Sequence, residues 1–185
     1  PPATPPPPPP PTAEQLHGQV MNAVRPFMNG DPASQVALPA TLSSELGKLR
    51  TQVNGERARA KVEQDIKDAL KAAFDTEQWQ ATLTLCDATD ILDPGNTRVV
   101  RYRERATAEK NKPQVNVSGI FEVDGVSTVF MTVYLPETNE THEVKIREGE
   151  EFFGLMLEKI LGNNQGIQLK YFKTDQSFTV QGVSK

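Results

Sequence analysis

Apolar residues in the first part of the chain recur every three or four positions, which is the spacing that places side chains on one face of a helix. Polar and charged residues fill most of the positions between them. The segments with this spacing are residues 12–25, 41–53, 56–74, 76–92 and 97–112. The pattern therefore predicts a helical region that covers residues 13–112.

Prolines and short polar side chains at the ends of these segments predict where the helices begin and end. Thr12 is placed to cap the first helix, and Pro26 is expected to limit it at the preceding residue, where a following proline disfavours helical backbone. Asp75 or Thr76 is expected to open the fourth helix. Asn96 follows a proline and a glycine, and it is placed to cap the last helix.

Beyond Pro113 the pattern changes, because β-branched and aromatic residues alternate with polar ones. The alternation shifts at Gly119, as at a β-bulge, and Asp124-Gly125 is a typical hairpin turn. Residues 152–161 fit either a short helix or a strand that bends at Gly154. The other expected strands are residues 114–123, 126–135, 142–147, 167–172 and 177–180.

These two patterns together predict an α+β fold, in which a helical N-terminal half is followed by a small antiparallel β-barrel or β-sandwich. About six short strands within roughly 70 residues is the density of such a domain. The expected domains are a proline-rich linker at 1–12, the helical region at 13–112 and the β-domain at 113–185.

The N-terminal segment is a separate compositional region, because nine of the 15 prolines lie within residues 1–11. Proline excludes helix and inner strand, so this stretch is expected to form a polyproline II rod. We favour a spacer over a ligand for an aromatic groove, since no basic residue flanks the prolines. A signal peptide or membrane anchor removed upstream of the chain is also expected.

Composition narrows the function. The chain has 185 residues, a net charge of −4, one cysteine and two histidines. One cysteine excludes an intrachain disulfide and a zinc site built from cysteines. No apolar window of about 18 residues is present to span a membrane, and the acidic balance disfavours nucleic acid as a partner. No catalytic motif emerges, so we expect no enzyme activity, no cofactor and no metal.

Two local features carry weaker chemical signals. Cys86 lies in an apolar helical segment far in sequence from both histidines, which favours a buried, inert thiol over a nucleophile. Arg98, Arg101 and Arg105 share one helix face, with Arg103 close by. We interpret this cluster as a solvated helix face, because nucleic-acid binding needs a wider basic surface.

The run from Ala69 to Pro94 resembles a tetratricopeptide-type helical hairpin. The cues are a first helix rich in alanine and leucine, Trp79 near the turn, and a proline-glycine stop after Leu92. The resemblance implies a helical groove that binds a peptide or a protein. An ordinary helix pair that ends at a proline is the alternative interpretation.

The second half carries a further resemblance. Its strand that ends in Gly119-Ile120, the strand 129–135, the segments 144–150 and 153–160, and the closing strand 167–171 follow one another in a characteristic order. Over residues 115–181 this order resembles the periplasmic β-domain of PilP-type pilus-assembly lipoproteins and the homologous region of the type II secretion inner-membrane component.

The resemblance implies a non-catalytic scaffold of the cell envelope that belongs to a type IV pilus or a type II secretion-like machine. Its partners would be proteins of that assembly, its location the periplasm or envelope, and its membrane link an upstream anchor outside this chain. A helical-repeat adaptor that binds peptides, with an accessory β-domain, is the alternative function. A small β-barrel that binds nucleic acid is a third and more distant one.

Two surfaces are the candidate binding sites of this scaffold. The first is a strand edge near residues 167–172, where Ile167, Leu169 and Tyr171 would meet a partner, since an unpaired edge accepts a further strand. The second is an apolar patch with Phe152 and Phe153. The alternative for the two phenylalanines is the core, where adjacent apolar residues at a strand start commonly lie.

Overall fold

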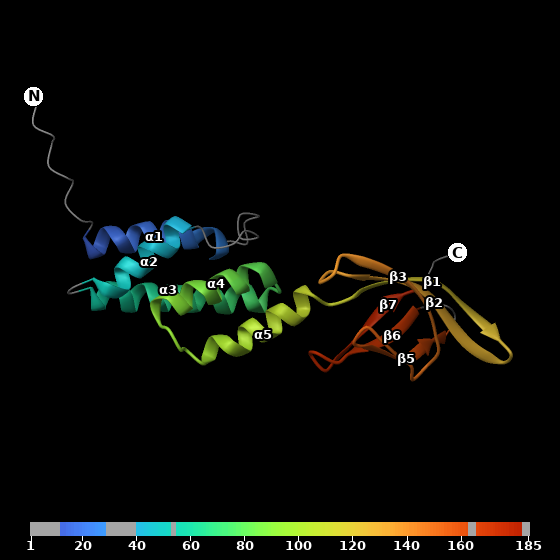
Figure 1. Cartoon of the computed structure of the whole chain (residues 1–185). Coiled ribbons are helices and arrows are strands. Elements are labelled where there is room, and N and C mark those ends of the chain that lie inside the picture. Colours follow the sequence, from blue (N-terminus) through green and yellow to red (C-terminus); the bar gives the residue numbers. More distant parts are fainter. Residues whose placement is uncertain (1–11, 29–39, 53–54, 163–165, 183–185) are drawn as a thin grey trace, which may run out of the picture. The chain divides into compact units, whose positions relative to one another are not determined.

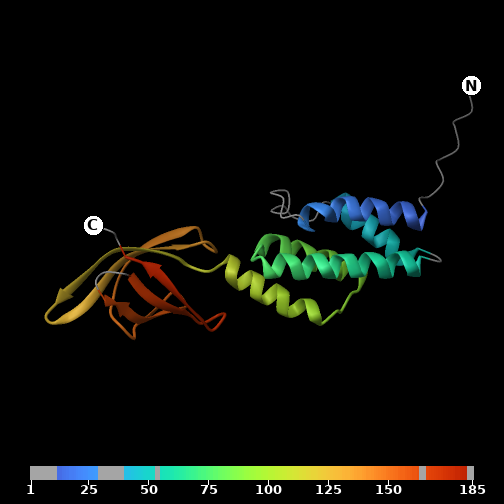
Figure 2. The same ribbon diagram turned by 180° about the vertical axis from the view of Figure 1, so that it is seen from behind.

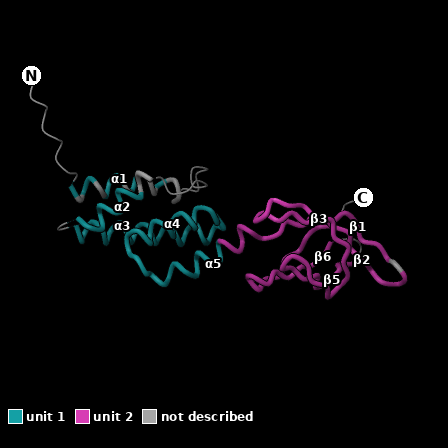
Figure 3. Tube along the Cα trace, in the orientation of Figure 1, with its two compact units in different colours: residues 1–106 teal, residues 107–185 magenta. Residues whose placement is uncertain are grey.

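The computed structural model describes residues 12–28, 40–52, 55–162 and 166–182. The chain divides into two compact units, residues 1–106 and 107–185 (Figure 3). Helices occupy the first part and antiparallel sheets the second, which confirms the α+β class. The proline-rich run at 1–11 lies outside the described residues. The described helices are α1 Ala13–Met28, α2 Ala40–Thr51, α3 Glu56–Asp75, α4 Trp79–Leu92 and α5 Arg98–Lys110 (Figure 1).

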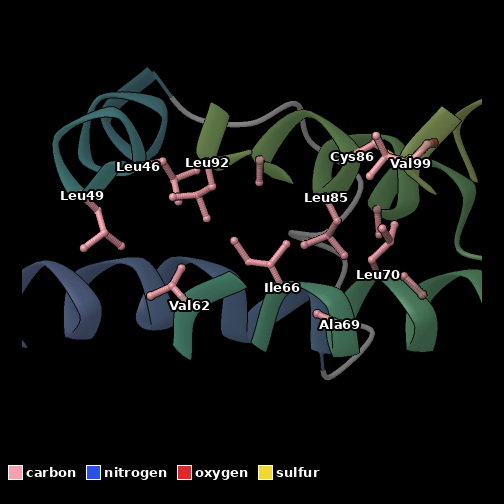
Figure 4. Close-up of a cluster of buried hydrophobic side chains, with 13 residues drawn as sticks. Leu46, Leu49, Val62, Ile66, Ala69, Leu70, Leu85, Cys86, Leu92 and Val99 are labelled. Carbon is pink, nitrogen blue, oxygen red and sulfur yellow. Dashed lines mark hydrogen bonds between the residues drawn. The ribbon is translucent and has the colours of Figure 1, made fainter. Parts of the chain in front are cut away.

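The helical unit is built around α3 and α4, which pack against each other along their length (Figure 2). Helix α1 also contacts α3, and α2 contacts α4. The apolar stripe of α3 enters the core through Val62, Ile66 and Leu70, as its three- and four-residue spacing predicts (Figure 4). The other buried residues of this core are Leu46, Leu49, Ala69, Ala73, Ala81, Leu85, Cys86, Ala88, Leu92 and Val99.

Helix α4 is buried on most of its surface, and three of its buried residues are threonines. The hydroxyls of Thr82, Thr84 and Thr89 each donate to the carbonyl oxygen four residues earlier, at 2.9–3.0 Å. These bonds satisfy the hydroxyls inside the helix itself, so the threonines pack in an apolar core without an unpaired donor.

The helix ends partly follow the prediction. The Thr12 hydroxyl accepts the Gln15 backbone N–H, and the Gln15 side chain accepts the Thr12 N–H, which together form a capping box. Asn96 caps α5 by accepting the Arg98 N–H at 3.0 Å. Pro26 does not end α1, which runs on to Met28. The proline removes only its own backbone hydrogen bond, and two helical residues follow it, so the helix loses little by continuing to Met28.

The predicted start of α4 is also wrong, because neither Asp75 nor Thr76 opens this helix. Asp75 is the last residue of α3, and Thr76 caps that helix by donating its hydroxyl to the Ala72 carbonyl oxygen at 2.8 Å. Glu77 then takes a left-handed backbone with φ of 58°, which turns the chain before α4 begins at Trp79. A threonine at this point caps the preceding helix instead of the following one.

The β unit contains two antiparallel sheets, one in the order β1-β2-β3 and one in the order β4-β5-β6-β7. The bulge after Val117 and the turn at Asp124-Gly125 are confirmed, and both turn residues have positive φ, as in a type I′ hairpin. Residues 152–161 form two strands joined by a turn at Gly154, so the strand interpretation holds. The strands are β1 Gln114–Val123, β2 Val126–Leu135, β3 Glu140–Ile146, β4 Glu151–Phe152, β5 Leu155–Leu161, β6 Gly166–Tyr171 and β7 Gln176–Gln181.

One buried cluster joins the two sheets. Val129, Met131 and Val133 alternate along β2 toward the core, and a second bulge on β5 keeps Leu157 and Ile160 on one face. This arrangement is compatible with a sandwich, and the described strands do not form a closed barrel. The remaining fully buried members are Ala108, Val117, Ile146, Leu155, Ile167, Leu169 and Tyr171.

The β unit begins before the predicted boundary near Pro113. Its first residue is Thr107, inside the last turns of α5. Tyr171 donates its hydroxyl to the Ala108 carbonyl oxygen at 2.9 Å, and the Lys112 ammonium lies 3.9 Å from the centre of the Phe178 ring. These contacts attach the C-terminal end of α5 to the sheets. The sequence composition does not change at Thr107, so it gave no sign of this earlier boundary.

Candidate functional site

The predicted edge at residues 167–172 is not an edge. Strand β6 pairs with β5 on one side and with β7 on the other. Ile167 and Leu169 are 0% exposed and Tyr171 is 1% exposed, because their alternating side chains all face the core. The expectation that these three residues form an accessible binding edge is therefore wrong.

The two adjacent phenylalanines have different environments. Phe152 is half-buried and packs against the core of the β unit. Phe153 is 43% exposed, and its ring stacks on the His142 ring with the centroids 4.7 Å apart. Its backbone is left-handed with φ of 46°, a conformation that costs a bulky side chain about 1–2 kcal/mol. Of the predicted patch, only Phe153 presents an aromatic ring to solvent.

The more prominent surface is the end of the β1–β2 hairpin. Strand β3 pairs with β2 from Leu135 only as far as Val129, so residues 126–128 of β2 pair with β1 alone. Among the described residues, this end of the sheet is two-stranded, and the orange-yellow hairpin extends past the neighbouring strands (Figure 1). Backbone groups on its outer edges are therefore open to a further strand.

An aromatic pair lies on this hairpin. Phe121 is 58% exposed, and its ring meets that of Phe130 edge to face at 5.5 Å. The Lys145 ammonium lies 5.5 Å from the centre of the Phe130 ring. Gly119 makes the arrangement feasible, since a Cβ there would lie 2.5 Å from the Phe121 ring. The bulge and the glycine thus place an aromatic ring on the open face.

A hollow of about 570 Å³ borders the same hairpin. Ile120 and Ile160 form part of its apolar wall, and Arg147 and Glu148 contribute one charge of each sign. The Glu148 carboxylate accepts the Ile160 backbone N–H, which fixes the wall on β5. The other residues that line the hollow are Gly125, Val126, Ser127, Leu161 and Gly162.

The helical unit has a second surface with distinct chemistry, which we call the arginine hollow. It has a volume of about 660 Å³ and is lined by Phe74, Thr97, Arg98, Arg101 and Tyr102. Phe74 meets Tyr102 edge to face at 4.8 Å. Arg98 and Arg101 are both exposed. Helix α5 therefore places two guanidinium groups beside an aromatic wall.

Arg103 has a different role from its neighbours in the cluster. Its two terminal nitrogens donate to Asp87 and Asp90, each at 2.6 Å. This fork joins α5 to α4, and the hydrogen bond to Asp87 raises the pKa of Arg103 above its usual value. The four arginines predicted to form a solvated face thus divide, since Arg103 is a structural link between helices.

Cys86 is buried in the helical core, as predicted. Burial raises the pKa of its thiol from 9.0 to about 11, and its Sγ lies 3.9 Å from the Val99 carbonyl oxygen. A thiol so far from ionisation is a weak nucleophile at neutral pH.

We expect Cys86 to react with a disulfide reagent such as dithionitrobenzoate about a hundredfold more slowly in the folded chain than in 6 M guanidinium at pH 8, because two pKa units remove about that fraction of thiolate. The measurement is the release of the coloured thiolate over time. Equal rates in the folded and unfolded chain would show that the thiol is accessible and ionised.

The described residues contain no group of three histidine, cysteine, aspartate or glutamate side chains placed to hold a metal ion. Nor does any described helix combine the length and the apolar character that crossing a membrane requires. Comparison of the chain with protein-family models, with curated proteins and with solved structures finds no match.

Neither the hairpin surface nor the arginine hollow was among the predicted sites. The signal for the hollow was present in the sequence, because the shared face of Arg98 and Arg101 follows from their spacing. Their proximity to Phe74 depends on how α3 and α5 pack. The exposure of Phe121 depends on which face of β1 the core covers, and alternation does not specify that face.

Proposed function

We propose that this chain is a non-catalytic scaffold protein that docks partner proteins through the end of the β1–β2 hairpin. The observation that carries the proposal is the exposed ring of Phe121 on a two-stranded sheet end, where it packs edge to face on the half-buried ring of Phe130. The β unit already has a filled core without this pair. Burying an aromatic side chain contributes about 2–3 kcal/mol, which a partner surface would supply.

The hairpin offers two kinds of contact at once. Its open edges accept backbone hydrogen bonds from an extended partner segment, and Phe121 provides a side-chain anchor beside them. We further propose that the two sheets pack face to face as a β-sandwich, which would hold the hairpin on a rigid base. Phe153, in its left-handed turn, is a second exposed aromatic residue of the same unit.

The resemblance of residues 115–181 to the β-domain of PilP-type lipoproteins supports a more specific form of the proposal. In this form the chain belongs to a type IV pilus or type II secretion-like machine, in the periplasm or cell envelope. Its partners are proteins of that assembly, and a membrane link is provided by an upstream anchor. The proline-rich run at residues 1–11 serves as the spacer to that anchor.

Replacing Phe121 with serine is expected to weaken partner binding at least about tenfold, because the anchor ring is lost while the core is untouched. A photocrosslinking residue at Phe130 would first identify the partner in an envelope extract, and its affinity would then be measured with both purified proteins. Pilus or secretion-platform proteins are the expected products.

Phe172→Ser is the matched control, since Phe172 is also exposed, at 42%, and lies in the turn after β6. Its affinity should stay within about twofold of the wild-type value. Equal losses for the two variants would contradict docking at the hairpin. Recovery of cytosolic chaperones alone would contradict the envelope assignment.

A helical-repeat adaptor is the second candidate function, and the arginine hollow favours it. In this proposal α3 and α4 form a tetratricopeptide-like hairpin, and α5 packs beside them as the next helix would in a repeat. Val99 of α5 reaches the common core, and Arg103 links the helix to α4. Peptide binding would then take place on the helical unit, not on the sheets.

A further inference from the structure

We propose that the arginine hollow binds an acidic segment of a partner protein in extended conformation, with two carboxylates separated by one residue. The site is distinct from the β1–β2 hairpin, so the proposal goes beyond docking there. It gives the adaptor function, on which it rests, a ligand of defined chemistry.

The first support is unpaired positive charge. Arg98 and Arg101 are exposed, and among the described residues neither guanidinium has a carboxylate partner within ion-pair distance. Arg103, on the opposite side of α5, shows the contrast because two aspartates hold it. Lys71 forms an ion pair with Asp75 of the same helix, and the hydrogen bond to Asp75 raises the pKa of Lys71. The two opposite charges cancel, so this pair adds no net charge to the hollow.

The second support is the spacing of the two arginines. Residues three apart on a helix are surface neighbours, with Cβ atoms about 5–6 Å apart. Two residues of an extended strand that are separated by one other face the same side about 6.6 Å apart. A Glu-x-Glu sequence therefore presents its carboxylates at nearly the spacing of Arg98 and Arg101. Guanidinium groups bind carboxylates through paired, charge-assisted hydrogen bonds.

The third support is the wall beside the arginines. Phe74 and Tyr102 are both half-buried and pack edge to face, so they form a fixed apolar surface. Trp79 extends the cluster, with its ring 5.7 Å from that of Phe74. An apolar side chain two residues beyond the second carboxylate, on the same side of the extended segment, would cover this surface. The volume of about 660 Å³ lies within the range of pockets that enclose small ligands.

An acidic peptide fits these features better than a nucleic acid does. The chain carries a net charge of −4, and a nucleic-acid site needs basic residues spread over a wide face. Here two free guanidinium groups are concentrated beside the rings of Phe74 and Tyr102. This combination of charge and apolar surface suits one short segment with acidic and apolar side chains. It is too small to contact the successive phosphates of a nucleic acid.

The test is fluorescence polarisation with the purified full chain and a labelled peptide, Gly-Glu-Ser-Glu-Ser-Phe-Gly, whose two glutamates and phenylalanine share one side of an extended segment. We expect a dissociation constant in the micromolar range, and R98Q/R101Q should raise it at least about tenfold. R57Q/K61Q is the matched control, because it removes the same charge from exposed positions of α3. That control, and Phe121→Ser on the hairpin, should stay within about twofold of wild type.

Three outcomes would overturn the proposal. The first is no binding of the peptide to the wild-type chain, and the second is equal weakening in R98Q/R101Q and R57Q/K61Q. The third is tighter binding of a single-stranded oligonucleotide that depends on Arg98 and Arg101, which would assign the hollow to nucleic acid. Hairpin docking is measured separately, with the crosslinked partner and Phe121→Ser, so failure of this site and failure of hairpin docking are distinguishable.

Discussion

Leu169→Ala is expected to lower the free energy of unfolding of the β unit by about 2–5 kcal/mol. Leu169 is fully buried on β6, where it lies opposite Leu157 of β5 and Phe178 of β7. Truncation would remove its packing with both neighbours and leave a cavity between strands that are held on either side. The more the surrounding side chains collapse into this cavity, the smaller the loss of unfolding free energy within this range.

The measurement is a urea titration followed by hydrogen exchange and mass spectrometry of peptides from β5, β6 and β7, which report the β unit alone. Phe153→Asn is the control, because asparagine tolerates the left-handed backbone and Phe153 is 43% exposed and outside the buried core. Its stability should stay within about 1 kcal/mol of wild type. A Leu169→Ala chain of unchanged stability would place this residue on an accessible surface.

Local periodicity was sufficient to predict most of the elements of the fold. The stripe of α3 and the alternation of β2 each depend on residues close together in the sequence, and both predictions agree with the structure. The hairpin at Asp124-Gly125 and the bulge before Gly119 have equally local causes. The helix ends at Pro26 and Thr76 were wrong, because a residue at a junction can serve either neighbouring segment.

Sheet order was not predictable in the same way, and the candidate site depended on it. An alternating strand such as β6 has the same pattern in the middle of a sheet as at its edge. Ile167, Leu169 and Tyr171 were therefore assigned to a surface although each is buried. Phe121 shows the opposite case, since its ring lies on the face of β1 away from the core, whereas the neighbouring Ile120 packs against the core.

The four arginines of α5 show why spacing alone does not assign a role. Arg98 and Arg101 face the hollow, whereas Arg103 faces α4 and forms its fork there. Helical geometry separates the two faces. Only the packing of α5 reveals that one face meets aspartates and the other an aromatic wall. The role of each arginine therefore depends on how α5 packs against its neighbouring helices. The number and spacing of arginines in the sequence do not predict it.

Gly166→Ala is expected to destabilise the β unit by at least about 3 kcal/mol, because two independent costs add. Gly166 has a φ of 131°, which an L-residue with a Cβ adopts only under strain. A Cβ at this position would also lie 2.1 Å from the Val180 carbonyl oxygen, an approach that only movement of β7 relieves. That movement would break the Gly166–Gln181 end of the β6–β7 ladder.

Gly162→Ala is the control, because it shows whether any glycine-to-alanine substitution near this loop destabilises the β unit. Among the described residues, no atom outside the two chain neighbours of Gly162 lies within 4 Å of a Cβ at this position, and its φ is not in the left-handed range. The stability of Gly162→Ala should therefore differ from wild type by less than about 1 kcal/mol. Urea titrations of both variants, followed by hydrogen exchange of β6 and β7, compare the two directly. If Gly166→Ala were neutral, β7 would have room to move away from β6. The firm pairing of β6 with β7, which holds this edge of the β4-β5-β6-β7 sheet, would then be absent.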